Sequence, residues 1–464
     1  MILFTLPYLI YEEGFNLKNI HIATQQKVNQ AYHKHDKNTR SATRMINICI
    51  CTDLWLETYH GGIERIIKFA KHISKHGINV YLVDRSRKKS LSALFLDGDK
   101  YYKMENGILK ERCYPFYIKF LFPGLIKFLQ EILNKWLSLL TRTVASEVTL
   151  FYTINPYLIV KLFFVCKKEK VDLIQCEFPT TTPSSFIVKK VLGIPLIYDA
   201  HNIESERIRS MAKVSKVYIS TTKQIEIISC RISDLVFVVS ENDKEQLLSW
   251  DIPDSKIEVI PNSVEVDKFS TLIEGSKIRK KYKLNNKRVF IFHGSLSYPP
   301  NKKAAERLIN SILPCILKKY PSAYLLLVGK NPPKTSHSNI IVTGFVKNLP
   351  EYIAAADIPV VPLLSGGGTK IKILEYMACG KAVVSTMKGA EGLNLQNERE
   401  ILVSKHPDSE FIKLVFKLIE DNNLRKNIGL NARKKIELFY DWEKTAKKAI
   451  DIYRNLTCMR KKKQ

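Results

Sequence analysis

Residues 358–392 constrain the fold of this chain more than any other stretch. An apolar run at 358–364 is typical of a buried parallel strand. Three glycines follow at 366–368, and a helical pattern then covers 369–379. Gly380 is a suitable helix stop, and a second apolar run covers 382–385. A strand, glycine loop, helix and strand form a βαβ unit, so the sequence predicts an α/β fold with a parallel sheet.

The glycine loop before this helix predicts a phosphate-binding site. The first N–H groups of a helix have no internal partner, and the helix dipole makes that end positive. Glycines allow the backbone to approach an anion closely because they lack a β-carbon. The loop residues expected at the anion are Gly366, Gly367, Gly368 and Thr369.

Three charged residues at this helix extend the prediction. Lys370 and Lys372 stand in the expected first turn, where a helix usually carries acids, and they fit a bound polyphosphate. Glu375 lies about one and a half turns further on, and an acid there suits hydroxyl recognition, such as a ribose. The alternative is a tight strand–helix turn with solvated lysines.

The same stretch, GGGTKIKILEYMACGKAVVSTMKGAEGL, closely resembles the donor-binding signature of the family 4 (group 1) glycosyltransferases of the GT-B fold. In that family the loop and helix hold the diphosphate of a nucleotide sugar, and the helix glutamate binds the ribose. The family pattern is E-x7-E. Here Glu375 is the second glutamate and Gly367 stands at the first position, as in one branch of the family.

Two motifs in the first half of the chain also resemble the family. A strand expected at 46–51 is followed by Gly61 and Gly62, which the resemblance places opposite the donor phosphates; a simple turn is the alternative. The string DAHNIE at 199–204 follows an expected strand and resembles the motif whose histidine contacts the donor sugar. This assigns His201 near the reaction centre, although a lone histidine at a strand end is more often structural.

Two turns in the second half complete the expected donor site. The resemblance places Gly294 at the phosphates and Val346 at the nucleotide base. Many members have arginine and lysine after the first of these turns, where this chain has Ser295 and Asn301. The positive charge must then come from Lys302, Lys370 or Lys372, and we expect Lys370 and Lys372 to supply it.

The resemblance implies two Rossmann-like domains that face a cleft, with a C-terminal helix crossing back to the first domain. We expect a disordered extension at 1–44, an acceptor-side domain at 45–265 and a nucleotide-sugar-binding domain at 266–440. A crossover helix and basic tail fill 441–464. The chain of 464 residues is long enough for two separate cores.

Composition bears on partners and compartment. The formal net charge is +28, which favours an anionic partner, either a nucleic acid or an anionic membrane surface. The nine cysteines are scattered and odd in number, which favours a reducing, cytoplasmic setting without a disulfide framework.

A stretch at 116–140 is the expected membrane contact. Residues 125–140 form a strongly amphipathic pattern that is too interrupted to span a bilayer, which needs roughly 20 mostly apolar residues. Neighbouring lysines suit the inner face of the cell membrane, with the protein bound peripherally. The alternative is an ordinary helix packed on the first sheet.

Asp97 and Asp99 match the DxD pattern of metal-dependent GT-A glycosyltransferases. They lie between two short β-like runs, so we interpret them as a hairpin turn and expect no metal site and no cofactor.

Together these patterns predict a retaining, metal-independent glycosyltransferase of the hexosyltransferase type (EC 2.4). The resemblance implies a UDP- or GDP-linked sugar donor, a lipid-linked or other glycoconjugate acceptor hydroxyl, and His201 and Glu375 as catalytic residues. The alternatives are a basic nucleic-acid-binding protein, disfavoured because the basic runs lack stacking aromatics, and a GT-B enzyme such as a sugar-nucleotide epimerase.

Overall fold

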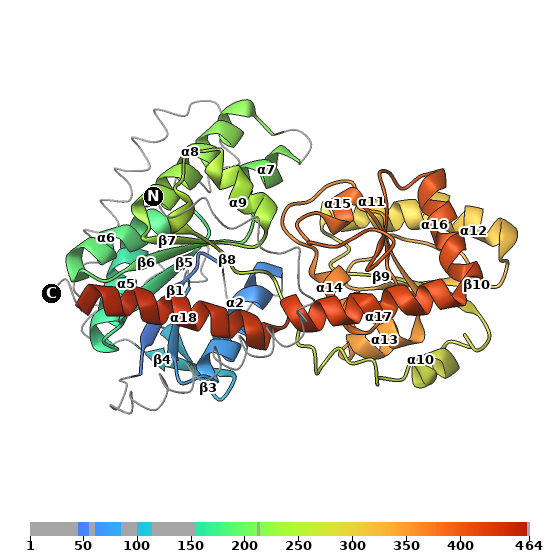
Figure 1. Ribbon diagram of the computed structural model, residues 1–464, viewed down its shortest axis with the longest axis horizontal. Coiled ribbons are helices and arrows are strands. Elements are labelled where there is room, and N and C mark those ends of the chain that lie inside the picture. Colours follow the sequence, from blue (N-terminus) through green and yellow to red (C-terminus); the bar gives the residue numbers. More distant parts are fainter. Residues whose placement is uncertain (1–44, 55–60, 85–99, 114–153, 211–213, 462–464) are drawn as a thin grey trace, which may run out of the picture. The chain divides into compact units, whose positions relative to one another are not determined.

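The computed structural model describes residues 45–54, 61–84, 100–113, 154–210 and 214–461. The predicted extension at 1–44, the amphipathic stretch at 116–140 and the Asp97–Asp99 pattern lie outside these residues. Figure 1 labels the helices and strands that follow.

The first domain contains an eight-stranded sheet in the order β4-β3-β2-β1-β5-β6-β7-β8. All neighbours pair in parallel except the edge hairpin, in which β3 pairs antiparallel with both β2 and β4. The strands are β1 (Asn47–Cys51), β2 (Asn79–Val83), β3 (Lys100–Glu105), β4 (Ile108–Cys113), β5 (Leu173–Glu177), β6 (Leu196–Ala200), β7 (Leu235–Val238) and β8 (Ile257–Val259).

The edge hairpin turns at Asn106 and Gly107, which both have positive φ angles, 50° and 78°. An Asn-Gly pair with positive φ at both positions is a favoured two-residue hairpin turn. The second of the two β-like runs predicted around Asp97 and Asp99 lies in β3, whereas β4 and this turn were not predicted.

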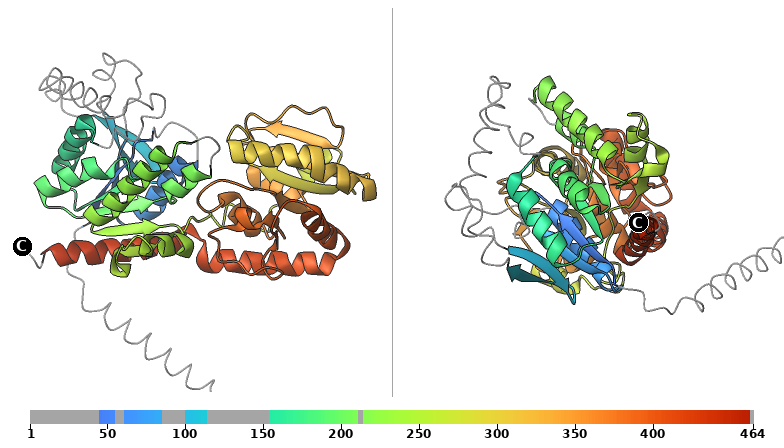
Figure 2. Two further views of the ribbon diagram at one scale, coloured as in Figure 1. Left: turned by 90° about the horizontal axis from the view of Figure 1, so that it is seen from above. Right: turned by 90° about the vertical axis from the view of Figure 1, so that its left-hand side faces the viewer.

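Alternation along the strands divides the first core into two hydrophobic clusters. Figure 2 shows helices on both faces of the twisted sheet. On β1, Ile48 and Ile50 pack in one hydrophobic cluster, and Cys49 and Cys51 pack in the other. This follows from the two-residue period of a strand. The first-domain helices are α2 (Gly61–Ser74), α5 (Pro156–Lys168), α6 (Thr182–Leu192), α7 (Glu204–Arg209), α8 (Lys216–Ile232), α9 (Glu241–Leu248) and the short η3 (Asp254–Lys256).

The second domain contains a six-stranded parallel sheet in the order β11-β10-β9-β12-β13-β14, the strand order of a Rossmann fold. Its strands are β9 (Arg288–His293), β10 (Ala323–Val328), β11 (Ile340–Gly344), β12 (Ile358–Val361), β13 (Val384–Thr386) and β14 (Leu402–Ser404). Its helices are α10 (Ser276–Lys281), α11 (Pro299–Arg307), η4 (Leu308–Ile312), α12 (Leu313–Lys319), α13 (Leu349–Ala355), α14 (Ile371–Ala378), α15 (Met387–Ala390), α16 (Ser409–Glu420) and α17 (Asn422–Phe439).

The last helix, α18 (Trp442–Lys461), returns to the first domain. Its buried residues Trp442, Ala449 and Tyr453 join the cluster that contains Phe69 of α2. The predicted crossover is therefore confirmed, and the helix extends to Lys461, into the residues expected as a basic tail.

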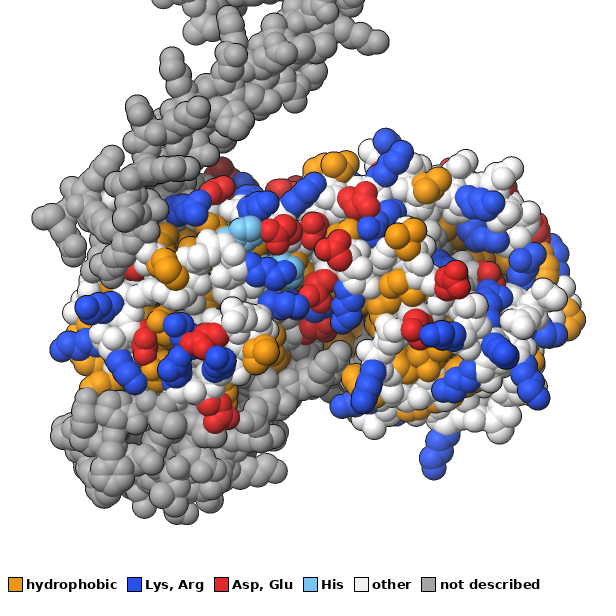
Figure 3. All heavy atoms as spheres, turned by 90° about the horizontal axis from the view of Figure 1, so that it is seen from below, with side chains coloured by type: hydrophobic (Ala, Val, Ile, Leu, Met, Phe, Trp, Pro, Cys, Tyr) orange, Lys and Arg blue, Asp and Glu red, His pale blue; other side chains and the backbone are white. Residues whose placement is uncertain are grey.

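Surface composition is mixed in the described part of the chain. On the face shown in Figure 3, lysine and arginine side chains are interspersed with acidic and hydrophobic ones. No helix among the described residues combines the length and apolar composition needed to cross a bilayer.

Candidate functional site

Both sheets reverse their strand order at one point, between β1 and β5 in the first sheet and between β9 and β12 in the second. Ligands of open α/β sheets bind outside the carboxyl ends of the strands at such points. Glu177 ends β5 and His293 ends β9, and both are buried. The predicted site residues lie in the loops and helices that follow these strands.

Helix α2 begins at Gly61, so Gly61 and Gly62 are its first two residues. The sequence had predicted both glycines in a loop before the helix. A β-carbon built on Gly62 would lie 3.0 Å from the Phe178 ring and 3.6 Å from Nδ1 of His201. One on Gly61 would meet no atom within 4 Å. Glycine at 62 therefore brings a helix N-terminus against His201, while Gly61 faces open space.

The predicted donor loop uses left-handed backbone at two of its glycines. Gly366 and Gly368 have φ angles of 110° and 62°, which favour glycine over other residues. A β-carbon on Gly367 would lie 2.7 Å from the Cβ and Cγ atoms of Arg207, and one on Gly368 would lie 3.2 Å from the backbone oxygen of His201. The loop therefore packs closely on the segment that carries His201.

Helix α14 starts at Ile371, two residues later than predicted, because Lys370 has the extended conformation of an N-cap residue. Lys370 is consequently not in the first turn. Its ammonium donates hydrogen bonds to the carbonyls of Gly366, Gly367 and Gly368. Burial lowers its pKa to about 8. Lys370 thus stabilises the conformation of the glycine loop by hydrogen bonds to its backbone.

Lys372 lies in the first turn of α14 and is buried. Its Nζ atom is 2.7 Å from Oδ1 of Asn301 and 4.1 Å from the centre of the Phe292 ring. A β-carbon on Gly294 would lie 3.1 Å from the same Nζ. Burial, together with the charge of Lys370, lowers the pKa of Lys372 to about 7. The ammonium therefore stands at the turn where Ser295 and Asn301 provide no positive charge.

Glu375 faces the end of β9. Its Oε2 atom lies 3.3 Å from Nε2 of His293, and the next residue, Tyr376, accepts a hydrogen bond from the backbone N–H of His293 at 2.9 Å. Burial raises the pKa of Glu375 to about 8 and lowers that of His293 well below its ordinary value. A buried carboxyl group can pair with hydroxyl groups by hydrogen bonding, which suits their recognition.

The two remaining predicted residues lie in turns after strands. Gly294 has a φ of 146°. Its carbonyl oxygen would lie only 1.8 Å from a β-carbon on Gly329. The turns after β9 and β10 can therefore approach each other only because residue 329 is glycine. Val346 follows β11 and is half-buried against the core of the second domain. It lies in a different turn from the loop glycines at 366–368.

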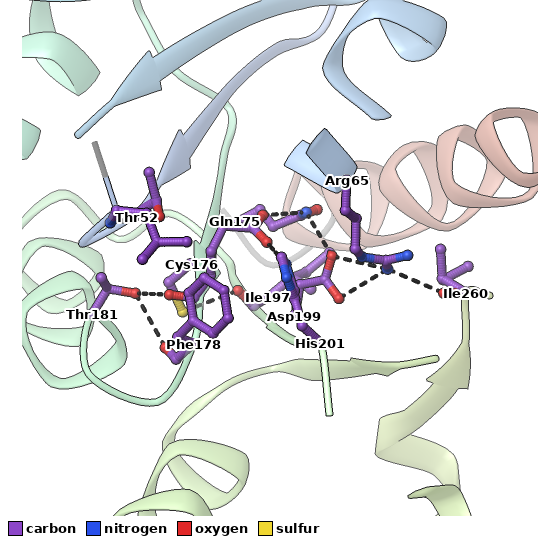
Figure 4. Close-up of polar contacts among 12 residues, drawn as sticks. Thr52, Arg65, Gln175, Cys176, Phe178, Thr181, Ile197, Asp199, His201 and Ile260 are labelled. Carbon is purple, nitrogen blue, oxygen red and sulfur yellow. Dashed lines mark hydrogen bonds and ion pairs between the residues drawn. The ribbon is translucent and has the colours of Figure 1, made fainter. Parts of the chain in front are cut away.

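His201 follows β6 and is buried (Figure 4). Its Nε2 atom lies 2.5 Å from Oε2 of Glu177, and the Phe178 ring packs on the imidazole with centroids 4.3 Å apart. Burial lowers the pKa of His201 to about 4 and raises the pKa of Glu177 to about 7. The histidine is fixed at one nitrogen and directed towards Gly62 at the other.

Arg65 anchors the polar layer beside this histidine, as Figure 4 shows. It donates hydrogen bonds to both carboxylate oxygens of Asp199, at 3.1 and 3.2 Å, and to Oδ1 of Asn262 at 3.1 Å. Asn262 in turn donates to Oγ1 of Thr369 at 2.7 Å. A continuous chain of hydrogen bonds therefore connects β6 with the donor loop.

The sequence analysis missed Arg65, Glu177 and Gln175 as parts of the site. One signal was present for Arg65, which stands four residues before Phe69 on the apolar face of α2, where a charge needs a partner. Gln175 and Glu177 are polar residues in a strand whose five residues are all buried.

Glu177, Asp199 and His201 bring three potential metal ligands within 4.8 Å of one another. Their arrangement does not fit a divalent cation, because Arg65 already pairs with Asp199 and Nε2 of His201 is directed at Glu177. We therefore interpret the cluster as a hydrogen-bonded network and not as a metal centre.

Two Rossmann-like domains, a glycine loop at a helix N-terminus and buried lysines beside it define a class of protein that binds phosphate-bearing ligands such as nucleotides. Residues 140–268 match the family model described as Glycosyltransferase Family 4, and residues 287–421 match the one described as Glycosyl transferases group 1. The chain belongs to this family of glycosyltransferases, which has the GT-B fold and uses nucleotide-sugar donors.

Similar proteins support this assignment. The chain is 28% identical over 314 residues to the uncharacterized glycosyltransferase MJ1069 of Methanocaldococcus jannaschii, covering 64% of this chain and 78% of that protein. It is 24% identical over 316 residues, with the same coverage, to the UDP-Gal:alpha-D-GlcNAc-diphosphoundecaprenol alpha-1,3-galactosyltransferase of Escherichia coli.

Solved structures share the fold. Sucrose-phosphate synthase from Thermosynechococcus elongatus superposes with a TM-score of 0.66 at 16% identity, covering 89% of this chain and all of that chain. Anabaena HepE in complex with UDP superposes with a TM-score of 0.61 at 15% identity, covering 88% of this chain and all of that chain.

Proposed function

We propose that this glycosyltransferase moves a hexose from a UDP-linked donor to a hydroxyl of a lipid-linked acceptor, with retention at the anomeric carbon and without a metal. The observation that carries the donor assignment is the buried ammonium of Lys372, which lies at the Gly294 turn beside the N-terminus of α14. An ammonium and unpaired N–H groups at one point favour a diphosphate.

The roles of the other residues follow from that position. Glu375, one turn further along α14, accepts hydrogen bonds from the ribose hydroxyls. His201 contacts the transferred sugar, since the donor loop packs against its backbone at Gly368. The N–H groups at Gly61 and Gly62 and those of residues 366–369 face the phosphates, and the turn at Val346 holds the base.

The leaving diphosphate develops negative charge during transfer, and preorganised amides and lysines stabilise such charge. A same-face attack assisted by the leaving phosphate needs no covalent nucleophile. This agrees with the contact between Glu177 and His201, because the Glu177 carboxyl group is already engaged by Nε2 of His201. Two findings favour the choice of donor and acceptor. HepE was solved with UDP and with UDP-glucose, and the E. coli relative acts on a diphosphoundecaprenol acceptor.

The test of the donor site compares two variants. Glu375→Ala should weaken UDP binding by about ten- to a hundredfold, because the hydrogen bonds between the ribose hydroxyls and the buried Glu375 carboxyl group are lost. His201→Ala should leave UDP affinity within about twofold and reduce turnover steeply, as expected for a contact made mainly in the transition state. Unchanged UDP affinity in folded Glu375→Ala, or unchanged turnover in His201→Ala, would overturn the assignment.

A screen of nucleotide sugars by thermal shift identifies the donor, since a ligand present at 100 times its Kd adds about 2.7 kcal/mol of stability. Stabilisation by GDP-linked sugars alone would replace UDP in the proposal. Conversion of the bound nucleotide sugar into its epimer, with no transfer to an acceptor, would favour the epimerase alternative.

The membrane partner is proposed from the sequence at 116–140. Liposomes with anionic lipid should bind the protein and release it at high salt, because the attraction is electrostatic. Replacement of Leu129, Ile132 and Trp136 by glutamate should abolish flotation. An insoluble triple variant would assign this face to the core.

A further inference from the structure

Glu177 is a buried carboxylate to which the proposed transfer assigns no task. It ends β5 and is only 1% exposed. One oxygen, Oε2, lies 2.5 Å from Nε2 of His201, and the other, Oε1, accepts a hydrogen bond from Nε2 of Gln175 at 2.8 Å. Both oxygens therefore have fixed partners.

Gln175 is itself held in one orientation. The hydroxyl of Tyr453, on α18, donates a hydrogen bond to Oε1 of Gln175. The amide nitrogen of Gln175 must then face the carboxylates, and it lies 3.4 Å from Oδ2 of Asp199 as well. Because an amide NH₂ can only donate, Gln175 fixes Glu177 as an acceptor on that side.

The second nitrogen of His201 is the one left for substrate. The Phe178 ring packs against the imidazole, and Nδ1 points towards the start of α2, where a β-carbon on Gly62 would lie 3.6 Å away. Because Nε2 is engaged with Glu177, any contact of this ring with a sugar must use Nδ1.

The state of Nδ1 depends on how many protons the Glu177–His201 pair carries. With one proton, the carboxylate is ionised, the proton lies on Nε2, and Nδ1 is an acceptor. With two protons, Nδ1 carries a hydrogen whether the second proton resides on the carboxyl group or on the imidazole. Loss of a single proton therefore converts Nδ1 from a donor to an acceptor.

We propose that Glu177 is a positioning residue for sugar transfer: its carboxylate keeps the proton of His201 on Nε2, so that Nδ1 accepts a hydrogen bond from a hydroxyl of the transferred sugar. This rests on the proposed contact between His201 and the sugar. The second partner, Gln175, and through it Tyr453 of α18, maintain the geometry.

Burial and nearby charges determine the pH at which the Glu177–His201 pair loses its second proton. Burial raises the pKa of Glu177 to about 7, against the lowering effect of Gln175 and Arg65. Burial lowers the pKa of His201 to about 4. The other charged groups that face His201 are Asp199 on β6, Arg65 on α2, Asp53 after β1 and Glu204 on α7. The pair consequently loses its second proton near neutral pH, and turnover should rise with pH through that region.

Glu177→Gln tests the proposal, because the amide keeps the shape and removes the titration. The variant should lose the rise in turnover near neutral pH and show a fall in kcat of about tenfold or more, with UDP affinity and the donor KM changed by less than about twofold. Glu177→Asp, which keeps the charge, should retain the rise and recover part of kcat. A Glu177→Gln variant that keeps both kcat and the wild-type pH profile would overturn the proposal.

Glu226→Gln is the matched control. Burial raises the pKa of the Glu226 carboxyl group to about 7 as well, but its oxygens accept hydrogen bonds from the backbone N–H groups of Glu204 and Ser205. This variant should keep the rise in turnover near neutral pH. Loss of the rise in Glu226→Gln would assign it to Glu226 and overturn the role of Glu177.

A second measurement needs neither substrate nor a folded variant of Glu177. Nitrogen NMR of histidine-labelled protein, with the His201 signals assigned from His201→Asn, reports the tautomer directly. Above neutral pH the wild-type protein should show hydrogen on Nε2 and none on Nδ1; hydrogen on Nδ1 would overturn the proposal. The NMR result tests the tautomer of His201, whereas turnover of His201→Ala tests the proposed contact with the sugar. Failure of one proposal can therefore be distinguished from failure of the other.

Discussion

The ammonium of Lys372 lies 2.7 Å from the side-chain oxygen of Asn301, a residue 71 positions earlier in the chain. The contact joins the start of α14 to the start of α11 beside the Gly294 turn. Lys370, two positions before, is directed instead into the carbonyls of its own loop. The two lysines therefore have different tasks: one faces the proposed diphosphate, and the other shapes the loop.

Replacement of Lys372 by methionine separates these tasks. Lys372→Met should weaken UDP binding by about ten- to a hundredfold and leave uridine binding within about twofold, because only the diphosphate loses its cation. Lys303→Met, which removes an exposed lysine from α11, is the control and should change neither affinity. Titration calorimetry measures both ligands. An equal loss of UDP and uridine affinity would instead indicate a distorted site.

Nucleotide binding should be accompanied by proton uptake. Burial lowers the pKa of Lys372 to about 7 and that of Lys370 to about 8, whereas a bound diphosphate favours the ammonium form and raises both pKa values. Above about pH 8 both lysines must gain a proton on binding, so UDP affinity should fall with rising pH by up to about tenfold per pH unit for each lysine.

Calorimetry in two buffers of different ionisation enthalpy measures this uptake. Lys372→Met should remove the part that belongs to Lys372. The same proton uptake in Lys372→Met and in the wild-type protein would assign it to Lys370 or to Glu375, whose pKa values both lie at about 8.

Activity should not require a divalent metal. In the Glu177–Asp199–His201 cluster, Asp199 is already paired with Arg65 and His201 with Glu177, and Lys372 at the start of α14 supplies positive charge to the proposed diphosphate. Transfer should therefore survive EDTA, and it should survive the paired replacement Asp97→Ala, Asp99→Ala. Loss of transfer in EDTA that Mn²⁺ restores would contradict this expectation.

The sequence predicted elements well where a single local signal decides them. The sequence predicts a helix at 182–192 and a strand at 288–293, and both agree with α6 and β9. Helix periodicity defines the first and an apolar run the second, each bounded by turn residues. The sequence also predicts a helix at 301–313, and this prediction is wrong in extent, because the helical segment covers 299–319. The chain continues through a π-helical turn, η4, into α12 because Pro314, which has no N–H, lies at the start of the new helix.

Only part of the site could be predicted. The glycine loop, Lys372 and Glu375 lie within ten residues of one another, so a local pattern reveals them. Arg65 and Asp199 are 134 positions apart, and Gln175 and Tyr453 are 278 apart. No spacing rule connects such residues, because the packing of α2 and α18 on the first sheet brings them together.

Arg65→Met should destabilise the protein in a pH-dependent manner. Arg65 and Asp199 are 2% and 1% exposed, and removal of the guanidinium leaves a buried carboxylate without its cation. Breaking a buried ion pair in this way typically costs about 3–5 kcal/mol in the free energy of unfolding. Arg209→Met, which breaks the exposed pair with Glu206, should cost less than about 0.5 kcal/mol.

The pH dependence gives the sign of the effect. Burial already raises the pKa of Asp199, and Arg65 is the main group that lowers it, so this pKa should rise further in Arg65→Met. A folded state that binds more protons than the unfolded state loses stability as pH rises. The cost should be small below about pH 4, where Asp199 is protonated in both states, and complete above its raised pKa.

Denaturant unfolding at several pH values measures this cost. The double variant Arg65→Met, Asp199→Asn should recover most of the stability lost at neutral pH, because the unpaired charge is removed with its partner. Equal destabilisation of Arg65→Met at acidic and neutral pH, with no recovery in the double variant, would show that Arg65 contributes by packing and not by compensating Asp199.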